Sequence, residues 1–315
     1  MRVEQALGVD FRRTTPARVF TMPSGMRIRY DRPSDRLQPY VTGYAIYINE
    51  HRAPMSNWFL PSPAMITVLL DAGRVTASIR NRTYDTVPAA ALWGPASHAP
   101  HTITRGGIMV GVGLTALGWA RLTARPADLY ANTVSPVADV IGSEKAGDLV
   151  AALDGLDTDA GFAPTLNQAL PALLQHESPP QHTMIEALER MIVSDGVIGV
   201  SEVAVDLGVS ARDLRRIASR YFGMPSKVLL SRARFVRSYV RWLMMGEPGS
   251  YLGIDSSYFD ASHFLRDAQT YLGTTPRRFA DRHATFLKAS LYARSALIGA
   301  PAHTLHHQQQ SSSNM

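Results

Sequence analysis

Apolar and polar residues alternate over short stretches in the first third of the chain, and this pattern predicts β-strands. Turns that contain glycine or proline separate the stretches. The predicted strands cover residues 41–49, 64–71, 74–81, 90–93 and 107–114. Short strands at this spacing indicate a β-sandwich or a small barrel.

Further along the chain the pattern changes to helix. Short helical pieces are predicted at 144–153 and 163–174, and they end before Ser178-Pro179-Pro180, where consecutive prolines disfavour helix. We therefore expect an N-terminal domain at 1–177, a linker at 178–181 and an all-helical domain at 182–298. The low-complexity end, 299–315, is expected to be a disordered tail.

The helical part contains a near-repeat, and this is the most informative feature of the sequence. Residues 202–223 and 251–273 each show a short helix, a tight turn and a second helix that ends near an aromatic-x-Gly sequence. Such pairs predict two helix-turn-helix units. A linker helix is predicted between them at 226–244, and it would span about 28 Å, comparable with the roughly 34 Å between successive major-groove faces of B-DNA.

The second helix of each unit has one apolar face and one polar face when projected at 100° per residue. Ser210 is the predicted N-cap of the first of these helices, with Asp213 three residues later. The predicted buried residues are Leu214, Ile217, Ala218 and Tyr221 in the first unit and Phe264, Ala268 and Tyr271 in the second. The predicted outward residues are Arg212, Arg215, Arg216, Ser219 and Arg220 in the first unit and Ser262, His263, Arg266 and Gln269 in the second.

The linker helix has a broad apolar face that can pack against both units. On its other side, Lys227, Arg234 and Arg241 suit phosphate contacts, although solvation explains them equally well. Arg232 projects toward the buried side, where an arginine needs a partner that the sequence does not identify.

Charge is distributed unevenly along the chain. The sequence has 32 Lys and Arg against 26 Asp and Glu, for a formal net charge of +6. Residues 37–181 are net acidic, whereas Arg212–Arg241 holds nine basic residues and one acid. This concentration favours a polyanionic partner, and the arginine face of the first unit has the donors to meet phosphates and guanine edges in double-stranded DNA.

Residues 182–282 resemble the DNA-binding domain of the AraC/XylS family of bacterial transcription regulators. The first unit carries the resemblance in Leu207-Gly208-Val209-Ser210 with Arg212, Leu214 and Arg216. The second carries it in Ser262-His263-Phe264, Arg266 and the run from Gly273 to Phe279. Departures are Ser257 at the usual turn glycine, Gly253 for alanine, Ala268 for phenylalanine and an early Pro225.

The resemblance implies a function and an architecture. The outward faces of both recognition helices would read major-groove bases, which implicates Arg212, Arg215 and Arg216, then Ser262, His263 and Arg266. The N-terminal part resembles the family's variable domains through Leu37–Val41, Phe59–Pro61 and Trp93–Pro95, which implies a cupin-like domain that binds an effector, dimerises, or both. The fold expected is therefore a two-domain α+β fold. The family's regulators mostly activate transcription through RNA polymerase.

Alternatives to a regulator remain open at this point. A cupin-like fold also hosts metal enzymes, and His98 and His101 are three residues apart, but no third ligand completes a pattern. We therefore expect no metal, no cofactor and no enzymatic activity. Trp58, Trp93 and Tyr44 could line an effector pocket, although aromatic residues of a β domain are usually core. A third hypothesis is a non-specific architectural DNA binder.

The lack of cysteine and of long apolar stretches restricts the chemistry and the cellular location expected for the protein. The chain has no cysteine, which excludes disulfides, thiol nucleophiles and zinc sites that need cysteine. No apolar stretch approaches the roughly 20 residues of a membrane span, and the amino terminus lacks the apolar core of a signal peptide. We expect a cytoplasmic, nucleoid-associated bacterial protein without a membrane partner.

Overall fold

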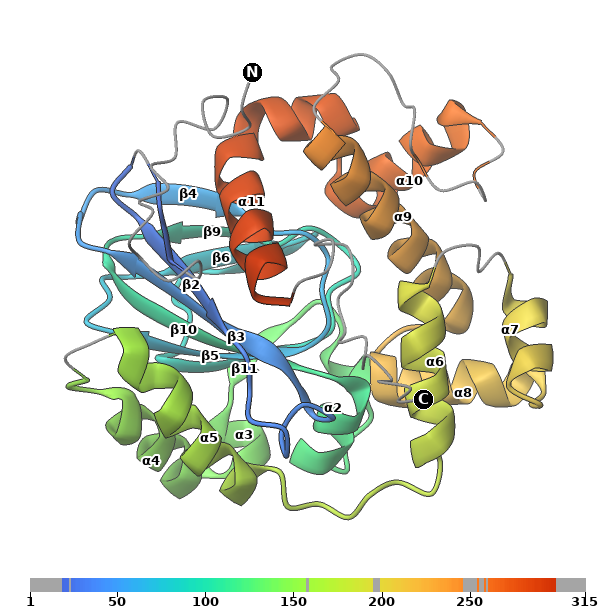
Figure 1. Cartoon of the computed structure of the whole chain (residues 1–315), viewed down its shortest axis with the longest axis horizontal. Coiled ribbons are helices and arrows are strands. Elements are labelled where there is room, and N and C mark those ends of the chain that lie inside the picture. The colour runs from blue at the N-terminus through green and yellow to red at the C-terminus, as the bar shows by residue number, and fades with distance from the viewer. Residues whose placement is uncertain are drawn as a thin grey trace, which may run out of the picture.

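The computed structural model describes residues 19–22, 24–156, 159–194, 199–245, 254, 258 and 260–298. The sequence-predicted tail at 299–315 and the first helix of the second unit, with Gly253 and Ser257, lie outside these residues. In the part described, a β domain precedes a helical domain (Figure 1). The two-domain α+β fold predicted from the sequence is confirmed.

The strands of the described residues form two antiparallel sheets that face each other. The larger sheet has the order β1-β2-β3-β10-β5-β8-β11 and the smaller has the order β4-β9-β6-β7. The bounds in the larger sheet are β1 Val19–Thr21, β2 Arg27–Asp31, β3 Val41–Asn49, β5 Met65–Leu70, β8 Ala90–Trp93, β10 Gly107–Leu114 and β11 Val134–Pro136. Those in the smaller sheet are β4 Met55–Trp58, β6 Thr76–Ile79, β7 Arg82–Tyr84 and β9 His101–Thr104.

The five predicted strands correspond to β3, β5, β6, β8 and β10. Central strands β3 and β10 pair over eight residues, and both are long and apolar. The strands that the pattern missed lie at sheet edges or are short, so burial does not impose a complete alternation on them.

Helices cover the outer face of the larger sheet (Figure 1). Leu149 of α4 and Leu166 of α5 pack with strand residues such as Val68 in one buried cluster. The helical elements of the β domain are α2 Ala116–Leu122, η1 Ala127–Tyr130, α3 Ala138–Ile141, α4 Ser143–Leu153, η2 Asp159–Gly161 and α5 Phe162–Leu173. Of the helices in the described residues, not one has the length and apolarity to span a bilayer.

The helical domain is built around α9 (Figure 1). The first helix-turn-helix unit packs at one end of α9, and α10, the second helix of the second unit, packs at the other end. The helices are α6 His182–Val193, α7 Val200–Asp206, α8 Ala211–Phe222, α9 Ser226–Met245, α10 Ala261–Leu272 and α11 Pro276–Ile298. The predicted linker helix at 226–244 is therefore confirmed. Its apolar residues are buried on several sides, including Leu229, Phe235 and Tyr239.

Arg232 of α9 lies buried at the boundary between the two domains. Its guanidinium Nη1 donates hydrogen bonds to the backbone oxygens of Ser62, at 3.1 Å, and Ala96, at 2.9 Å. Both carbonyls belong to the β domain, so this side chain finds its partners across the interface. Burial lowers the pKa of Arg232 to about 10, which still leaves it charged at neutral pH.

Three further contacts fasten the helical domain to the β domain. The backbone N–H of Ala99 donates to the Tyr271 oxygen at the end of α10, at 2.8 Å. The hydroxyls of Tyr30 on β2 and Ser290 on α11 are hydrogen-bonded at 2.8 Å. On the other side, the Glu189 carboxylate of α6 accepts a hydrogen bond from the backbone N–H of Ala116.

We predict that Arg232→Ala lowers the free energy of unfolding by about 3 kcal/mol, because two hydrogen bonds from a charged donor are lost and the buried Ala96 oxygen loses its partner. The Ser62 oxygen keeps the hydrogen bond from the Ala96 N–H. Urea unfolding at neutral pH measures the change. Lys227→Ala, on an exposed position of the same helix, serves as the control and should change stability by less than about 0.5 kcal/mol. Equal stability of the two variants would contradict the role of Arg232.

We also predict that Glu189 makes stability depend on pH. Burial, opposed by the Ala116 hydrogen bond and reinforced by Glu186, raises the pKa of Glu189 from 4.5 to about 8. The folded protein thus holds this proton more tightly than the unfolded chain, and the resulting stability is complete below pH 4.5 and is lost as the pH rises through 8. Glu189→Gln removes this loss.

The Glu189→Gln variant should therefore gain stability over the parent between pH 5 and 8, by up to about 5 kcal/mol at pH 8. Unfolding curves at several pH values measure the difference. The exposed Glu202→Gln is the matched control, and its curve should run parallel to that of the parent. A Glu189→Gln curve parallel to the parent's would show that Glu189 keeps an ordinary pKa.

Candidate nucleic-acid interface

Helix α8 carries the arginine face that the sequence predicts. Ser210 caps it, because its Oγ accepts from the Asp213 N–H at 3.1 Å, and Gly223 ends it with a left-handed φ of 76°. The predicted buried residues, Leu214, Ile217, Ala218 and Tyr221, are all buried. Arg212, Arg215, Arg216 and Arg220 are exposed, and Ser219 is half-buried. The projection therefore assigned both faces correctly.

The surroundings of Asp213 in the first turn of α8 favour its ionised carboxylate. The hydroxyl of Ser210 donates to the Asp213 carboxylate at 2.7 Å, and Arg216 lies 3.5 Å from the same carboxylate. The hydrogen bond from Ser210, assisted by Arg216, lowers the pKa of Asp213. Asp213 thus stabilises the first turn of α8 through its bonds with Ser210, while Arg212, Arg215 and Arg216 stay exposed.

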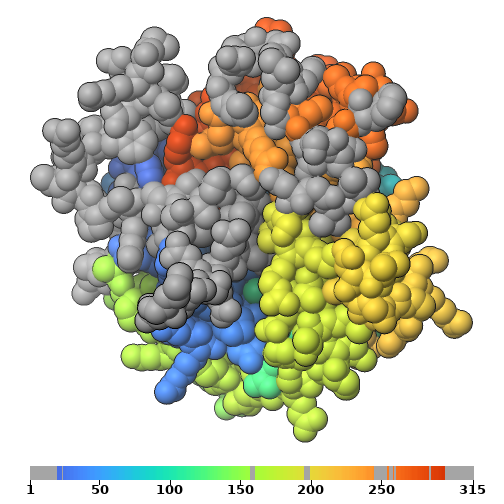
Figure 2. All heavy atoms as spheres, turned by 45° about the vertical axis from the view of Figure 1, so that its right-hand side comes forward, coloured from blue at the N-terminus to red at the C-terminus, as the bar shows by residue number. Residues whose placement is uncertain are grey.

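Helix α8 stands out from the rest of the molecule. In Figure 2 the yellow and gold atoms of the first unit form a projection on the right-hand side. The C-terminal end of α8 meets the β domain where Arg220 donates to the Ala124 oxygen at 3.3 Å, and the buried face of α8 packs in one cluster with α2 residues such as Leu117. The arginines near its N-terminal end are accessible to a duplex.

Helix α10 presents a smaller polar face. Asp260 caps it by accepting from the His263 N–H at 2.8 Å, and Gly273 ends it with a φ of 73°. Phe264, Ala268 and Tyr271 are buried, as predicted. Ser262, Arg266 and Gln269 are exposed, whereas His263 is half-buried. The amide of Gln269 also donates to the Gly273 oxygen at 3.1 Å.

His263 belongs to a polar cluster that ties α10 to α9. Its Nε2 lies 3.3 Å from Nη2 of Arg234, which can only donate, so the ring proton sits on Nδ1. The ring packs edge-on against Tyr258, with centroids 5.0 Å apart. Asp267 accepts from the Tyr258 hydroxyl at 2.7 Å and pairs with Arg234 at 3.3 Å.

This cluster corrects one expectation about the linker helix. Arg234, which the sequence made available to phosphates, is buried in this cluster. Its guanidinium also lies over the Tyr258 ring, at 4.6 Å. Lys227 remains exposed, and Arg241 is half-buried. The cluster could not be predicted from the sequence, because its members come from three separate segments.

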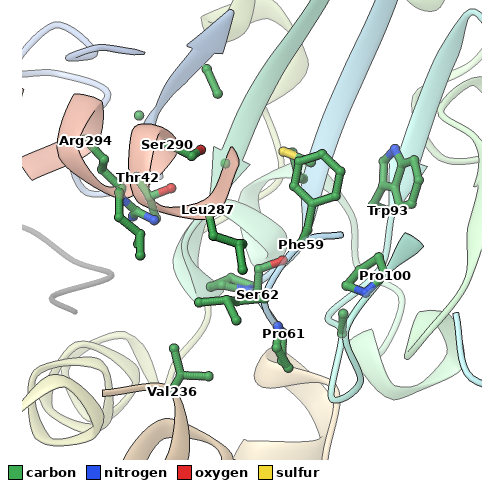
Figure 3. Close-up of a pocket in the computed structure, with 18 of the residues that line it drawn as sticks. Thr42, Phe59, Pro61, Ser62, Trp93, Pro100, Val236, Leu287, Ser290 and Arg294 are labelled. Atoms are coloured by element: carbon green, nitrogen blue, oxygen red, sulfur yellow. The ribbon is translucent and has the colours of Figure 1, made fainter. Parts of the chain in front are cut away.

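A cavity of about 180 Å³ lies between the two domains (Figure 3). The β domain contributes apolar and aromatic walls that include Phe59 and Trp93. Helix α9 contributes Val236, and α11 contributes Leu287 together with Ser290 and Arg294 at a polar end (Figure 3). The cavity is thus walled by both domains.

The aromatic residues named from the sequence lie in three different places. Trp93 lines the cavity, with its indole N–H donating to Thr67 at 2.9 Å. Tyr44 is buried in the core of the larger sheet and its hydroxyl bonds to Asn167. Trp58 packs at a tilt against the rings of His101 and His283. The cavity residues on α11 were missed, because nothing in that helix marks which strand it contacts.

The two histidines considered as metal ligands bond to different serines. Nδ1 of His98 lies 3.0 Å from the Ser97 hydroxyl, and Nε2 of His101 lies 2.8 Å from the Ser56 hydroxyl. Burial lowers the pKa of both rings. Within the described residues, no group of three side chains of the types His, Cys, Asp and Glu is placed to hold a metal ion.

No protein-family model and no curated protein matches this sequence. Solved structures with some likeness include apo ToxT from Vibrio cholerae, at 11% identity over 75% of this chain and 96% of that chain, with a TM-score of 0.40. ToxT bound to (E)-4-(8-methylnaphthalen-1-yl)but-3-enoic acid is 10% identical over 75% of this chain and 97% of that chain, with a TM-score of 0.42. The AraC-like transcriptional activator CuxR is 12% identical over 76% of this chain and 89% of that chain, with a TM-score of 0.31.

Proposed function

We propose that this protein is a sequence-specific DNA-binding transcription regulator of the AraC/XylS type. The observation that carries the proposal is the pair α8 and α10, each with a buried apolar stripe, an exposed polar face and a place at one end of α9. Recognition helices of helix-turn-helix proteins dock in this way, with base contacts from their outward side chains. Binding, not catalysis, is the activity proposed.

The two helices have different chemistry and so different roles. Arg212, Arg215 and Arg216 on α8 offer planar donor forks for guanine edges and phosphates, with Ser219 and Arg220 beside them. On α10, the proposed contacts come from Ser262, His263, Arg266 and Gln269. The bonds of His263 to Arg234 fix its ring orientation before DNA arrives, so it is a pre-positioned donor through Nδ1.

The β domain is proposed to be the regulatory part, with the interdomain cavity as the effector site. An effector there would touch α9 and α11 as well as the strands, so its binding energy would depend on how the domains sit together. A volume of about 180 Å³ is close to that of an engineered cavity, roughly 150 Å³, that binds benzene. A single-ring, largely apolar effector fits this size.

The family resemblance extends the proposal to partners. It implies activation of transcription through contact with RNA polymerase, and it leaves open a homodimer formed by the N-terminal domain. Two rival hypotheses predict other outcomes. A metal enzyme tethered to DNA predicts bound metal in the purified protein, and a non-specific architectural binder predicts near-equal affinity for unrelated duplexes at fixed salt.

We predict that the full chain selects a specific site from a pool of random duplexes and binds it at least about 10³-fold more tightly than unrelated DNA at fixed salt. Arg212→Ala and Arg266→Ala should each weaken specific binding by about 1–3 kcal/mol. Fluorescence anisotropy measures both, and a reporter gene behind the selected site should show activation by the parent only.

Lys145→Ala, an exposed charge on α4 of the β domain, is the control for net charge and should bind like the parent. Equal affinity for all duplexes would favour the architectural binder. Parent-like affinity of Arg212→Ala and Arg266→Ala would contradict the assignment of the reading faces.

For the cavity, we predict that a single-ring compound such as toluene raises the melting temperature of the parent by about 2–4 °C at ten times its Kd. Leu287→Trp fills the cavity and should abolish the shift. Leu129→Trp, on a residue 69% exposed, is the matched control and should keep it. A shift that persists in Leu287→Trp would place the ligand elsewhere.

A further inference from the structure

A basic surface continues from the end of α8 onto the β domain. The hairpin that joins β6 to β7 carries Arg80 and Arg82 on either side of Asn81, and all three are exposed. Arg125, just before η1, is exposed as well. Among the described residues, no carboxylate forms an ion pair with Arg80, Arg82 or Arg125. These charges are therefore available to an anionic partner.

Direct contacts connect this surface to α8. A Cβ atom at Gly223 would lie 2.7 Å from the Pro95 ring and 3.1 Å from the Ala127 oxygen, so the β domain abuts the end of the helix. Pro95 in turn accepts a hydrogen bond from the Asn132 N–H at 3.0 Å. A hollow of about 200 Å³ lies between Ala131–Asn132 and the hairpin Arg80–Arg82.

Arg125 lies beside the same end of α8. A second hollow, of about 390 Å³, is lined by both Arg125 and Arg220, with His176 and Glu177. The guanidinium of Arg125 donates to the Tyr130 hydroxyl at 2.7 Å, which orients it. Two acids lower the local positive charge: Glu177, which lines this hollow, and Asp128, which is exposed on η1.

The position of this surface decides which partner it fits. At 1.5 Å per residue, the twelve residues of α8 span about 18 Å, more than the roughly 12 Å width of the major groove. When the first turns of such a helix contact bases, its C-terminal end reaches the edge of the groove. The phosphate backbone lies at that edge, and the β domain adjoins α8 there.

Gly223 marks where α8 meets the β domain. At 100° per residue, Arg212, Arg216 and Ser219 follow one line along α8. Gly223 directly follows the helix with a left-handed φ of 76°, and the β domain touches the end of α8 there, at Pro95 and η1. DNA that lies along this line of α8 therefore reaches the β domain at the C-terminal end of the helix.

We propose that Arg80, Arg82 and Arg125 of the β domain bind the phosphates that flank the site read by α8. The inference rests on the proposed function, and it adds the β domain to the DNA interface. Most acids of the net acidic segment lie elsewhere, for example Asp139, Glu144 and Asp148 on α3 and α4. The segment's charge is thus divided between a basic surface beside α8 and an acidic surface away from it.

The experiment measures the salt dependence of binding by the full chain to its selected site, embedded in a duplex with ten base pairs on each side. Each phosphate neutralised contributes about 0.9 to the slope of log K against log salt concentration. Arg80→Ala/Arg82→Ala should reduce the magnitude of the slope by about 2, and Arg125→Ala by about 1. On a duplex trimmed to the site itself, these variants and the parent should have the same slope.

The control is Arg105→Ala/Lys145→Ala, which removes the same charge from exposed positions. Arg105 follows β9 at the end of the β6–β9 pair opposite to Arg80. This variant should keep the parent slope on both duplexes. An unchanged slope for Arg80→Ala/Arg82→Ala on the long duplex, with a parent that binds selectively, would overturn this inference alone. A parent without site selectivity would overturn the proposed function and this inference with it.

Discussion

The buried guanidinium of Arg232 is the interaction on which the arrangement of the two domains depends. A charged group at 3% exposure is tolerated only with partners in fixed positions, and here the partners are two backbone oxygens of the β domain. Because Arg232 sits on α9, and α8 and α10 pack at the two ends of α9, one contact relates both of these helices to the β domain. The bonds at Ala99 and Ser290 then fix the second unit and α11.

Much of the helical domain could be predicted from the sequence, since its helices are strongly periodic. The buried stripe of α8 and the length of α9 follow directly from apolar spacing. The two ends of α8 follow from Ser210, whose hydroxyl can cap the start of a helix, and from Gly223, whose backbone can adopt the left-handed conformation at its end.

The rest depends on contacts that leave little local signal. Arg232 pairs with backbone carbonyls, and any residue type has a carbonyl, so the sequence could show that a partner was needed but not which one. Tyr30 and Ser290 are 260 positions apart, and nothing in either segment indicates the other. The sequence predicts His263 on the outward face of its helix, and in the structure it is half-buried and held by Arg234 and Tyr258. These neighbours are set by tertiary packing.

The way α11 packs determines what the helical domain is like without its neighbour. Phe286 packs against Tyr47 of β3 and against Phe59, with ring centroids 5.8 Å and 5.2 Å away, and Leu287 is buried. Cutting the chain at Pro179-Pro180 would separate the two domains and leave these side chains in water as a continuous apolar strip. The helical half is therefore not a portable module: a fragment that begins at residue 182 would self-associate unless this strip were made polar.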